Sequence, residues 1–411
     1  MAKTQIITGI DIGTDSIKTL IAQRKKGEKI LELLKTVKSY SFGLRKGVVV
    51  DVIEVAKNIR NSVFAAREKF DKKINSVYVN IGGRHIYFAP SRGLVSVSRA
   101  DQKISQEDME RVLKAAQAIS LPSNYEILNV FPQEFIVDNQ GEIREPVGLT
   151  GIRLEAKVFL FCVFSPYLKN LTQSVLEAGF QIEDITASPL AAARSVISER
   201  EKELGVGLVD IGAATTGLAV FEEGKLIHLV VFPIGSANIT NDIAIGLRTK
   251  IEVAEKIKKQ FGCCLIEKEK KARCSDIAKS RKKIKISDNE NSLFFSQKLL
   301  TGIIEARVCE IFELVNKELK KVSRQQLLPA GLVLTGGGAK LKKIVELAKR
   351  ESKLPCRIGT PQGIVGIDED PTLSTVAGLV LEGLSSEEEG PPSFPQGIKS
   401  KLKRIFKIFI P

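Results

Sequence analysis

The chain has 411 residues, 43% hydrophobic and 27% charged, a composition typical of a globular protein with two or three compact domains. No run reaches the roughly 18 apolar residues of a spanning helix, and no secretory signal is recognisable, so we expect the protein on the cytoplasmic side. The net charge of +14 requires an anionic partner or surface, but no helix-turn-helix or zinc-finger pattern indicates nucleic acid.

Residues 1–82 form a strand-rich unit that ends in a helix and one more strand. Three β-type runs, at 5–11, 16–24 and 29–40, are separated by Gly-containing turn signals. Apolar residues at helical spacing predict a helix over 51–69, and 77–81 is a further strand. Strands followed by a helix and another strand indicate an α/β domain.

Residues 83–164 have a different character and predict a small inserted α+β subdomain. A helix is expected over 105–120, because Ser105 is a good N-cap and Asp108 stands three residues later, as in a capping box. Strands are expected over 135–137 and 153–164, and helices that close the first half over 168–179 and 188–203.

The same pattern of elements then returns. Strand-like runs occupy 206–210, 216–222 and 225–233, and a long helical stretch includes Ile239. Two Asp-Ile-Gly turns, which begin at Asp11 and 199 residues later, stand at matching places in these units. We interpret this as an internal duplication, with two similar halves around a cleft.

The first Asp-Ile-Gly turn joins one strand to the next and is a candidate phosphate loop. Glycine permits close approach, so the backbone N–H groups of the turn can converge on phosphate oxygens. Asp11 would hold hydrated Mg²⁺ and Lys18 would place a positive charge on a phosphate. The candidate residues are Asp11, Gly13, Thr14, Asp15, Ser16 and Lys18.

The second turn and a later glycine run complete a predicted ATP site. Asp210 is expected to share the Mg²⁺ through water. The run of three glycines lies between an apolar strand at 331–334 and a helix at 341–350, so its backbone can pass close to a flat ligand face or a phosphate. The candidate residues are Asp210, Gly212, Ala213, Ala214, Thr215, Thr216, Gly336, Gly337 and Gly338.

The order and spacing of the three motifs resemble the actin, Hsp70 and sugar-kinase superfamily, and within it the bacterial cell-division FtsA family. The runs ISQEDMERV from Ile104 and EILNVFPQEFIVD from Glu126 are characteristic of that family's inserted subdomain 1C. The resemblance implies an α/β, actin-like duplicated fold. It has two RNase H-like halves around a nucleotide cleft, an inserted small α+β subdomain and a C-terminal amphipathic helix.

The resemblance also implies domain boundaries. They are 1–82 plus 165–203 for the first half (1A), 83–164 for the insert (1C), 204–234 plus 301–383 for the second half (2A), 235–300 for subdomain 2B, 384–396 for a disordered linker, and 397–411 for a membrane-targeting helix.

Further residue roles follow from the same resemblance. Gly235 would border the phosphates, and Glu255 and Lys258 look like purine and ribose contacts, although a solvated helix face is the alternative. Arg307 and Glu310 fall in the region that receives the C-terminal peptide of FtsZ. The implied partners are FtsZ, a second copy in a filament and later division proteins, at the cytoplasmic face of the inner membrane in the septum.

The second loop departs from the family pattern. Ala213, Ala214 and Gly217 stand where glycines and an acidic residue are usual. Two methyl groups narrow the backbone's freedom, and the missing carboxylate removes a ligand for Mg²⁺ or water. With no general base evident, we expect ATP binding with at most weak hydrolysis, as a switch.

The C-terminal residues predict a membrane-binding helix after an acidic, proline-rich linker. On a helical wheel the apolar residues fall within an arc of about 100°, and the cations lie off it. Such a helix lies in the interface plane of an anionic lipid surface. The residues concerned are Ile398, Leu402, Lys403, Ile405, Phe406, Lys407 and Phe409.

Two other functions remain open from the sequence. One is an actin-like scaffold of type IV pilus assembly, as in the PilM family, which shares the insert but generally lacks the tail. The other is a kinase of the same superfamily, which needs a carboxylate base beside a substrate pocket. Binding of the FtsZ C-terminal peptide discriminates the division function from the pilus function.

Overall fold

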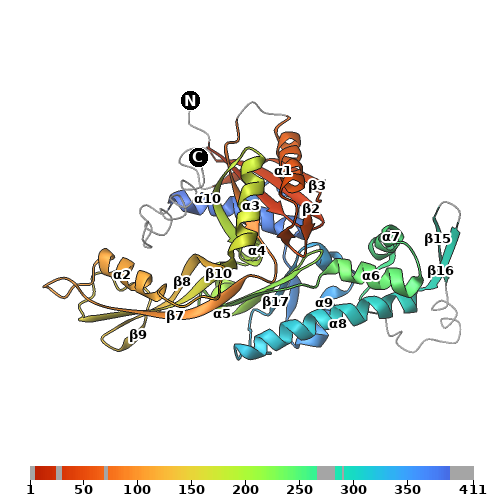
Figure 1. Cartoon of the computed structure of the whole chain (residues 1–411). Helices are drawn as coiled ribbons and strands as arrows, with labels where there is room; N and C mark the ends of the chain where they lie inside the picture. The colour runs from red at the N-terminus through yellow and green to blue at the C-terminus, as the bar shows by residue number, and fades with distance from the viewer. Residues whose placement is uncertain (1–4, 25–29, 69–72, 266–282, 289–290, 389–411) are drawn as a thin grey trace.

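The computed structural model describes residues 5–24, 30–68, 73–265, 283–288 and 291–388. Figure 1 shows two halves, each built on a β-sheet, and an elongated unit, coloured orange to yellow-green, that extends to the left of them. The predicted tail, 397–411, and the predicted linker from residue 389 onward lie outside the described residues.

A six-stranded sheet with the order β11-β6-β1-β2-β3-β19 forms the first half. The strands β1, β2 and β3 make an antiparallel meander, and β6 lies parallel to β1. Helices α1 and α3 cover one face, and α1 begins where the Asp51 side chain accepts the Glu54 N–H. The elements are β1 (Gln5–Ile12), β2 (Ser16–Arg24), β3 (Leu31–Tyr40), β4 (Leu44–Arg45), β5 (Val48–Val49), α1 (Val52–Arg67), β6 (Ser76–Ile81), α3 (Ser165–Glu177), β11 (Gln181–Ala187) and α4 (Ser188–Val196).

The second half repeats this topology, which confirms the predicted duplication. In its sheet, β14-β13-β12-β17-β18, an antiparallel meander is again followed by parallel strands. The elements are α5 (Glu199–Leu204), β12 (Val206–Ile211), β13 (Thr216–Glu222), β14 (Lys225–Phe232), β17 (Leu332–Thr335), the 3₁₀ helix η2 (Gly337–Lys340), α9 (Ile344–Ser352) and β18 (Cys356–Ile358).

The insert is a four-stranded antiparallel sheet, β7-β10-β8-β9, with one helix on it. Ser105 and Asp108 form the predicted capping box, and Leu113, Phe135 and Leu154 are among the residues of a core that belongs to this unit alone. The α+β subdomain is therefore confirmed. Its elements are β7 (Tyr87–Ser96), α2 (Gln106–Ala116), β8 (Tyr125–Val137), β9 (Gln140–Ile143) and β10 (Arg153–Phe164).

The region predicted as subdomain 2B contains helices and a β-hairpin. Its predicted boundary at residue 300 is wrong, because the long helix α8 runs through that position without a break and packs along α6. The elements are α6 (Ser236–Leu247), α7 (Ile251–Phe261), β15 (Lys283–Asp288), β16 (Asn291–Ser296) and α8 (Gln297–Lys321).

The end of the described chain returns to the first half, which corrects two predictions. Residues up to 383 were assigned to the second half, but β19 (Ile364–Val365) pairs with β3, and α10 (Ser374–Glu388), after the 3₁₀ helix η3 (Pro371–Leu373), covers the second face of the first sheet. Val376, Ala377 and Val380 share a core with residues of β1 and β2. The first five residues of the predicted disordered linker, 384–388, are helical because they continue α10, with Leu384 packed on this core.

The predicted helix over 188–203 is two helices. The first, α4, ends at Ile197, whose backbone is extended, and Ser198 caps α5 in a second capping box with Glu201. The break occurs because Ser198 offers its side chain to a backbone N–H of a new helix. This break lies where the chain passes from the first half to the second.

Candidate functional site

The first phosphate loop is a tight turn between β1 and β2. The Gly13 N–H donates to the Ser16 carbonyl at 3.2 Å, and a methyl group at Gly13 would lie 2.9 Å from that same oxygen. The strand register places Lys18 directly opposite Asp11, and its Nζ lies 2.6 Å from Asp11 Oδ2. The Thr14 hydroxyl accepts the Gly47 N–H at 3.1 Å, so this side chain faces the β4–β5 hairpin.

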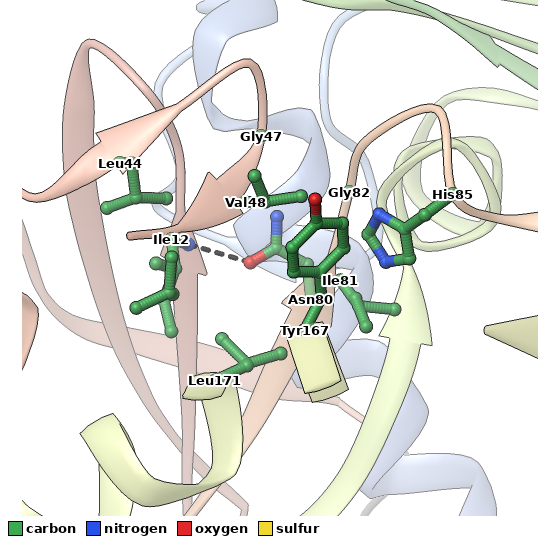
Figure 2. Close-up of a pocket in the computed structure, with 11 residues that line it drawn as sticks. Ile12, Leu44, Gly47, Val48, Asn80, Ile81, Gly82, His85, Tyr167 and Leu171 are labelled. Atoms are coloured by element: carbon green, nitrogen blue, oxygen red, sulfur yellow. Dashed lines mark hydrogen bonds between the residues drawn. The ribbon is translucent and has the colours of Figure 1, made fainter. Parts of the chain in front are cut away.

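Asn80, which the sequence analysis missed, holds the other oxygen of Asp11. Its Nδ2 donates to Asp11 Oδ1 at 2.8 Å. Its Oδ1 accepts the Ile12 N–H at 2.7 Å, the bond drawn as a dashed line in Figure 2. Both Asn80 and Asp11 are buried. One signal was present in the sequence: Asn80 is the single amide in an otherwise apolar stretch of strand, VYVNI.

Figure 2 also shows a small cavity beside this network, lined in part by His85 and Tyr167. Its volume is about 10 Å³, room for one water molecule, so it cannot hold a nucleotide. Burial lowers the pKa of His85 to about 4, and both of its ring nitrogens lack a hydrogen-bond partner among the described residues.

The second loop has the same turn, between β12 and β13. The Gly212 N–H donates to the Thr215 carbonyl at 2.9 Å. The carbonyls of Gly212 and Ala213 accept N–H groups from the first turn of α6, where a methyl group at Gly235 would lie 2.6 Å from the Ala213 oxygen. The loop is therefore packed tightly on the start of α6.

Thr216 is not placed to contact a ligand with its side chain. Its hydroxyl is fully buried and donates to the Ile234 carbonyl at 2.8 Å, so it stabilises the strand end behind the loop. Strand alternation turns this side chain inward, so a contact of Thr216 with nucleotide would have to come from its backbone.

The carboxylates of the two loops lie close enough to interact. Burial, and then the charge of Asp11, raise the pKa of Asp210 to about 7, while Lys18 acts against this shift. Burial would lower the pKa of Lys18, but Asp11, Asp210 and Asp15 together raise it above its usual value. Lys18 therefore interacts with carboxylates of both loops, most strongly with Asp11.

The glycine run after β17 packs directly on the second loop. Gly336 has a φ of +80°, and a methyl group there would lie 2.4 Å from Asp210 Oδ1. A methyl group at Gly338 would lie 2.3 Å from Ile211 Cγ2, whereas one at Gly337 would meet only Thr372, at 3.9 Å. Glycine is therefore required at the first and third positions by close packing, and at the first also by its backbone conformation.

Glu255 and Lys258 form a polar cluster on α7 rather than a solvated helix face. Lys258 is 8% exposed, and its Nζ lies 2.6 Å from Glu255 Oε2 and 2.7 Å from the Thr240 hydroxyl. Burial lowers the pKa of Lys258, although Glu255 and, more weakly, Asp15 oppose this shift. Lys258 Nζ also donates to the Ser236 carbonyl at 3.1 Å, and the Ser236 N–H donates to the Gly212 carbonyl, so this cluster lies beside the second phosphate loop.

Arg307 and Glu310 line a groove of about 340 Å³ between α6 and α8. Arg307 donates to both carboxylate oxygens of Asp242, at 2.6 and 2.8 Å, and also pairs with Glu310. These partners raise the pKa of Arg307, led by the hydrogen bond to Asp242. The side chain of Ile245 is 77% exposed beside them, so the groove combines a fixed cation, two carboxylates and an apolar surface.

Two further observations concern metal ions and membranes. In the described part of the chain, no three His, Cys, Asp or Glu side chains gather closely enough to hold a metal ion alone. Within those same residues, no helix has both the length and the apolar character needed to cross a bilayer.

Comparison with known proteins identifies the family. The family model described as "Cell division protein FtsA" matches residues 207–378, and that of the "SHS2 domain inserted in FTSA" matches residues 83–162. The cell division protein FtsA of Pseudomonas aeruginosa is 36% identical over 389 residues, which cover 94% of this chain and 91% of the relative.

Solved structures support the actin-like fold. The PilM–PilN type IV pilus biogenesis complex matches with a TM-score of 0.66 and 16% identity, covering 92% of this chain and 98% of that one. MreB5 of Spiroplasma citri bound to ADP matches with a TM-score of 0.56 and 13% identity, covering 94% and 99%. At these identities the likeness concerns the fold alone. The sequence relationship, in contrast, extends over nearly the whole chain, and it shows that this protein belongs to the FtsA family of cell division proteins.

Proposed function

We propose that the chain binds ATP between its two phosphate loops and uses it as a switch, with at most weak hydrolysis. The observation that carries the proposal is the group formed by Asp11, Lys18 and Asp210, contributed by both halves. A ligand with phosphates and a cation fits between such loops because their backbone N–H groups and Lys18 favour anions. Glu255 and Lys258 are the proposed purine and ribose contacts.

Mg²⁺ suits the charges of this group. Burial and then the negative charge of the neighbouring Asp11 raise the pKa of Asp210. A divalent cation bound through water would relieve the repulsion between the two carboxylates. We therefore assign Asp11 and Asp210 to hydrated Mg²⁺, which would neutralise phosphate charge. Lys18 would supply a further positive charge to the phosphates.

ATP titration of an Asp11→Ala variant, with Mg²⁺ present, tests this proposal. We expect the Kd to rise about tenfold or more, since a charged group that holds the metal and Lys18 is lost. Asp101→Ala is a suitable control, because Asp101 is an exposed carboxylate that pairs with Arg99 in the insert. An unchanged affinity of Asp11→Ala for ATP would show that Asp11 does not hold the metal.

We also propose that the groove between α6 and α8 receives the C-terminal peptide of FtsZ. Arg307 is held rigidly by Asp242 and Glu310, and the exposed Ile245 offers an apolar contact. Fixed polar groups beside an apolar surface are what peptide recognition needs.

Fluorescence anisotropy with a labelled FtsZ C-terminal peptide tests the groove. Arg307→Ala should weaken binding about tenfold, while Arg324→Ala should not, because Arg324 pairs with Glu222 away from the groove. Equal affinity of the unaltered protein and both variants for the peptide would exclude the groove as its binding site. Absence of binding even to the unaltered protein would favour a scaffold of the pilus-assembly kind.

Attachment to the inner membrane by residues 397–411 completes the proposed function. The full chain would lie on the cytoplasmic face of the membrane at the septum, assemble with copies of itself, tether FtsZ filaments and help to recruit later division proteins. Co-sedimentation with anionic liposomes should be lost in a chain that ends at Gln396. Equal sedimentation of the two chains would contradict the assignment of the tail.

A further inference from the structure

The orientation of the Asn80 amide is determined by its neighbours. The Ile12 backbone N–H can only donate, so the atom 2.7 Å from it must be the amide oxygen. The amide nitrogen then faces Asp11 Oδ1 at 2.8 Å and the Ser188 hydroxyl at 3.0 Å. Ser188 donates in turn to the Ile81 carbonyl at 3.2 Å. Every polar atom of the Asn80 amide thus has a partner.

In this network the two oxygens of Asp11 have different hydrogen-bond donors. Lys18 holds Oδ2, and Asn80 holds Oδ1 from a buried position, 4% exposed, that water barely reaches. A carboxylate that donors hold at both oxygens has a fixed plane, and each oxygen keeps a lone pair for another contact.

The network also reaches the second half through Ser188. This residue is the first of α4, and the next residue, Pro189, packs on Gly217, where a methyl group would lie 2.3 Å from Pro189 Cγ. Gly217 is directly opposite Asp210 in the strand register. The path from Asp11 to the second loop therefore consists of hydrogen bonds and one tight van der Waals contact.

We infer that Asn80 is a positioning residue of the nucleotide site, which sets the Asp11 carboxylate toward the bound metal and couples it through Ser188 to α4. The inference rests on the proposed binding of Mg·ATP. It differs from that proposal in assigning a role to a residue that touches neither the nucleotide nor the metal.

A double-mutant cycle tests it, with Kd for ATP measured by calorimetry in Mg²⁺ and in EDTA. Asn80→Ala should raise the Kd in Mg²⁺ about tenfold and the Kd in EDTA by less than about threefold. In an Asp11→Asn background, Asn80→Ala should have no further effect, because Asn80 acts through that carboxylate. Asn58→Ala, at a part-exposed asparagine on α1 that bonds the Phe42 carbonyl, is the control.

Additive effects of the two substitutions, or equal losses in Mg²⁺ and EDTA, would overturn the inference and leave Asn80 a merely structural residue. If Asn80→Ala does not fold, Ser188→Ala replaces it in the same cycle, because it removes an acceptor of the amide and keeps the Ile12 bond. The Kd for ATP in Mg²⁺ should then rise about twofold to threefold, and this rise should be absent in the Asp11→Asn background. Failure of the unaltered protein to bind Mg·ATP would instead refute the proposed function.

Discussion

The two phosphate loops have the same backbone turn but opposite electrostatic surroundings. Opposite Asp11, the neighbouring strand supplies Lys18, whereas the same register position opposite Asp210 is Gly217. Asp11 accepts hydrogen bonds from Lys18 and Asn80, while in the described part of the chain no donor reaches the Asp210 carboxylate. One loop is thus satisfied within the protein, and the other needs an external cation. Duplication preserved the scaffold but not the charge balance.

The largest expected effect comes from removing the shared cation. Lys18→Met should destabilise the protein by about 3 kcal/mol, because it leaves the buried Asp11 and the half-buried Asp210 carboxylates without compensation. Urea unfolding without nucleotide measures this change. Lys225→Met, at a surface pair with Glu223, should cost less than about 1 kcal/mol. A similar small loss in both variants would mean that the first loop does not depend on its lysine.

Glycine at the contact between β17 and the second loop should be next in importance. Gly336→Ala combines a positive φ with a methyl group 2.4 Å from Asp210 Oδ1, and should cost about 2 kcal/mol. The adjacent Gly337→Ala has open space and should change the unfolding free energy by less than about 0.5 kcal/mol. Thermal and urea unfolding of the pair compare them directly, and equal values would contradict the packing argument.

Titration of Asp210 should make the stability of the nucleotide-free protein depend on pH. Its folded pKa of about 7 lies above the unfolded value of 3.8, so the folded state binds the proton more tightly. The stability that protonation of Asp210 contributes is therefore fully present below about pH 4 and is lost as the pH rises through about 7. After solvent screening, Asp210→Asn should be more stable than the unaltered protein by about 1–2 kcal/mol at pH 8.

Urea unfolding at pH 5, 6, 7 and 8 checks this prediction, with Asp101→Asn as a control at an exposed carboxylate. Saturating Mg·ATP should flatten the pH dependence of the unaltered protein, because a cation favours ionised Asp210. A pH profile that survives Asp210→Asn unchanged would assign the titration to another group.

The smallest effect is expected at the two alanines of the second loop. Neither Ala213 nor Ala214 has a positive φ, so glycine is not needed for this turn. Ala213→Gly and Ala214→Gly should each lower stability by up to about 1 kcal/mol through unfolded-chain entropy. ATP affinity, measured by calorimetry, should change by less than about threefold. A large gain in affinity would show that the methyl groups restrict the loop after all.

Local patterns in the sequence predicted much of this molecule. The meander strands, the insert and the capping box of Ser105 with Asp108 follow from alternation and local side-chain bonds, which a sequence displays directly. The two Asp-Ile-Gly turns predicted the duplication because they occupy equal places in it. Family resemblance supplied Glu255 and Lys258, which the bare pattern would assign to a solvated helix face.

Long-range contacts were the part that the sequence could not show. Asn80 was missed because its partner Asp11 lies 69 positions away: the lone amide in an apolar strand marks the residue, but it does not show which group the amide bonds. Residues of α10 were assigned to the wrong half because they follow the second half in the chain, and only the tertiary structure shows their packing on β1 and β2. The inward direction of the Thr216 side chain was likewise hidden, because it depends on where β13 begins.

The return of α10 to the first half determines how mechanical load would enter the protein. α10 lies along β1 and against α4, where a methyl group at Gly378 would lie 1.6 Å from the Ala191 oxygen. A tether that begins after Glu388 would pull on this helix alone. Because the helix is packed on the first sheet as far as Leu384, the pull would act as shear, which many contacts resist together. The same helix contacts α4, so tension from a membrane would reach the element that joins the two halves.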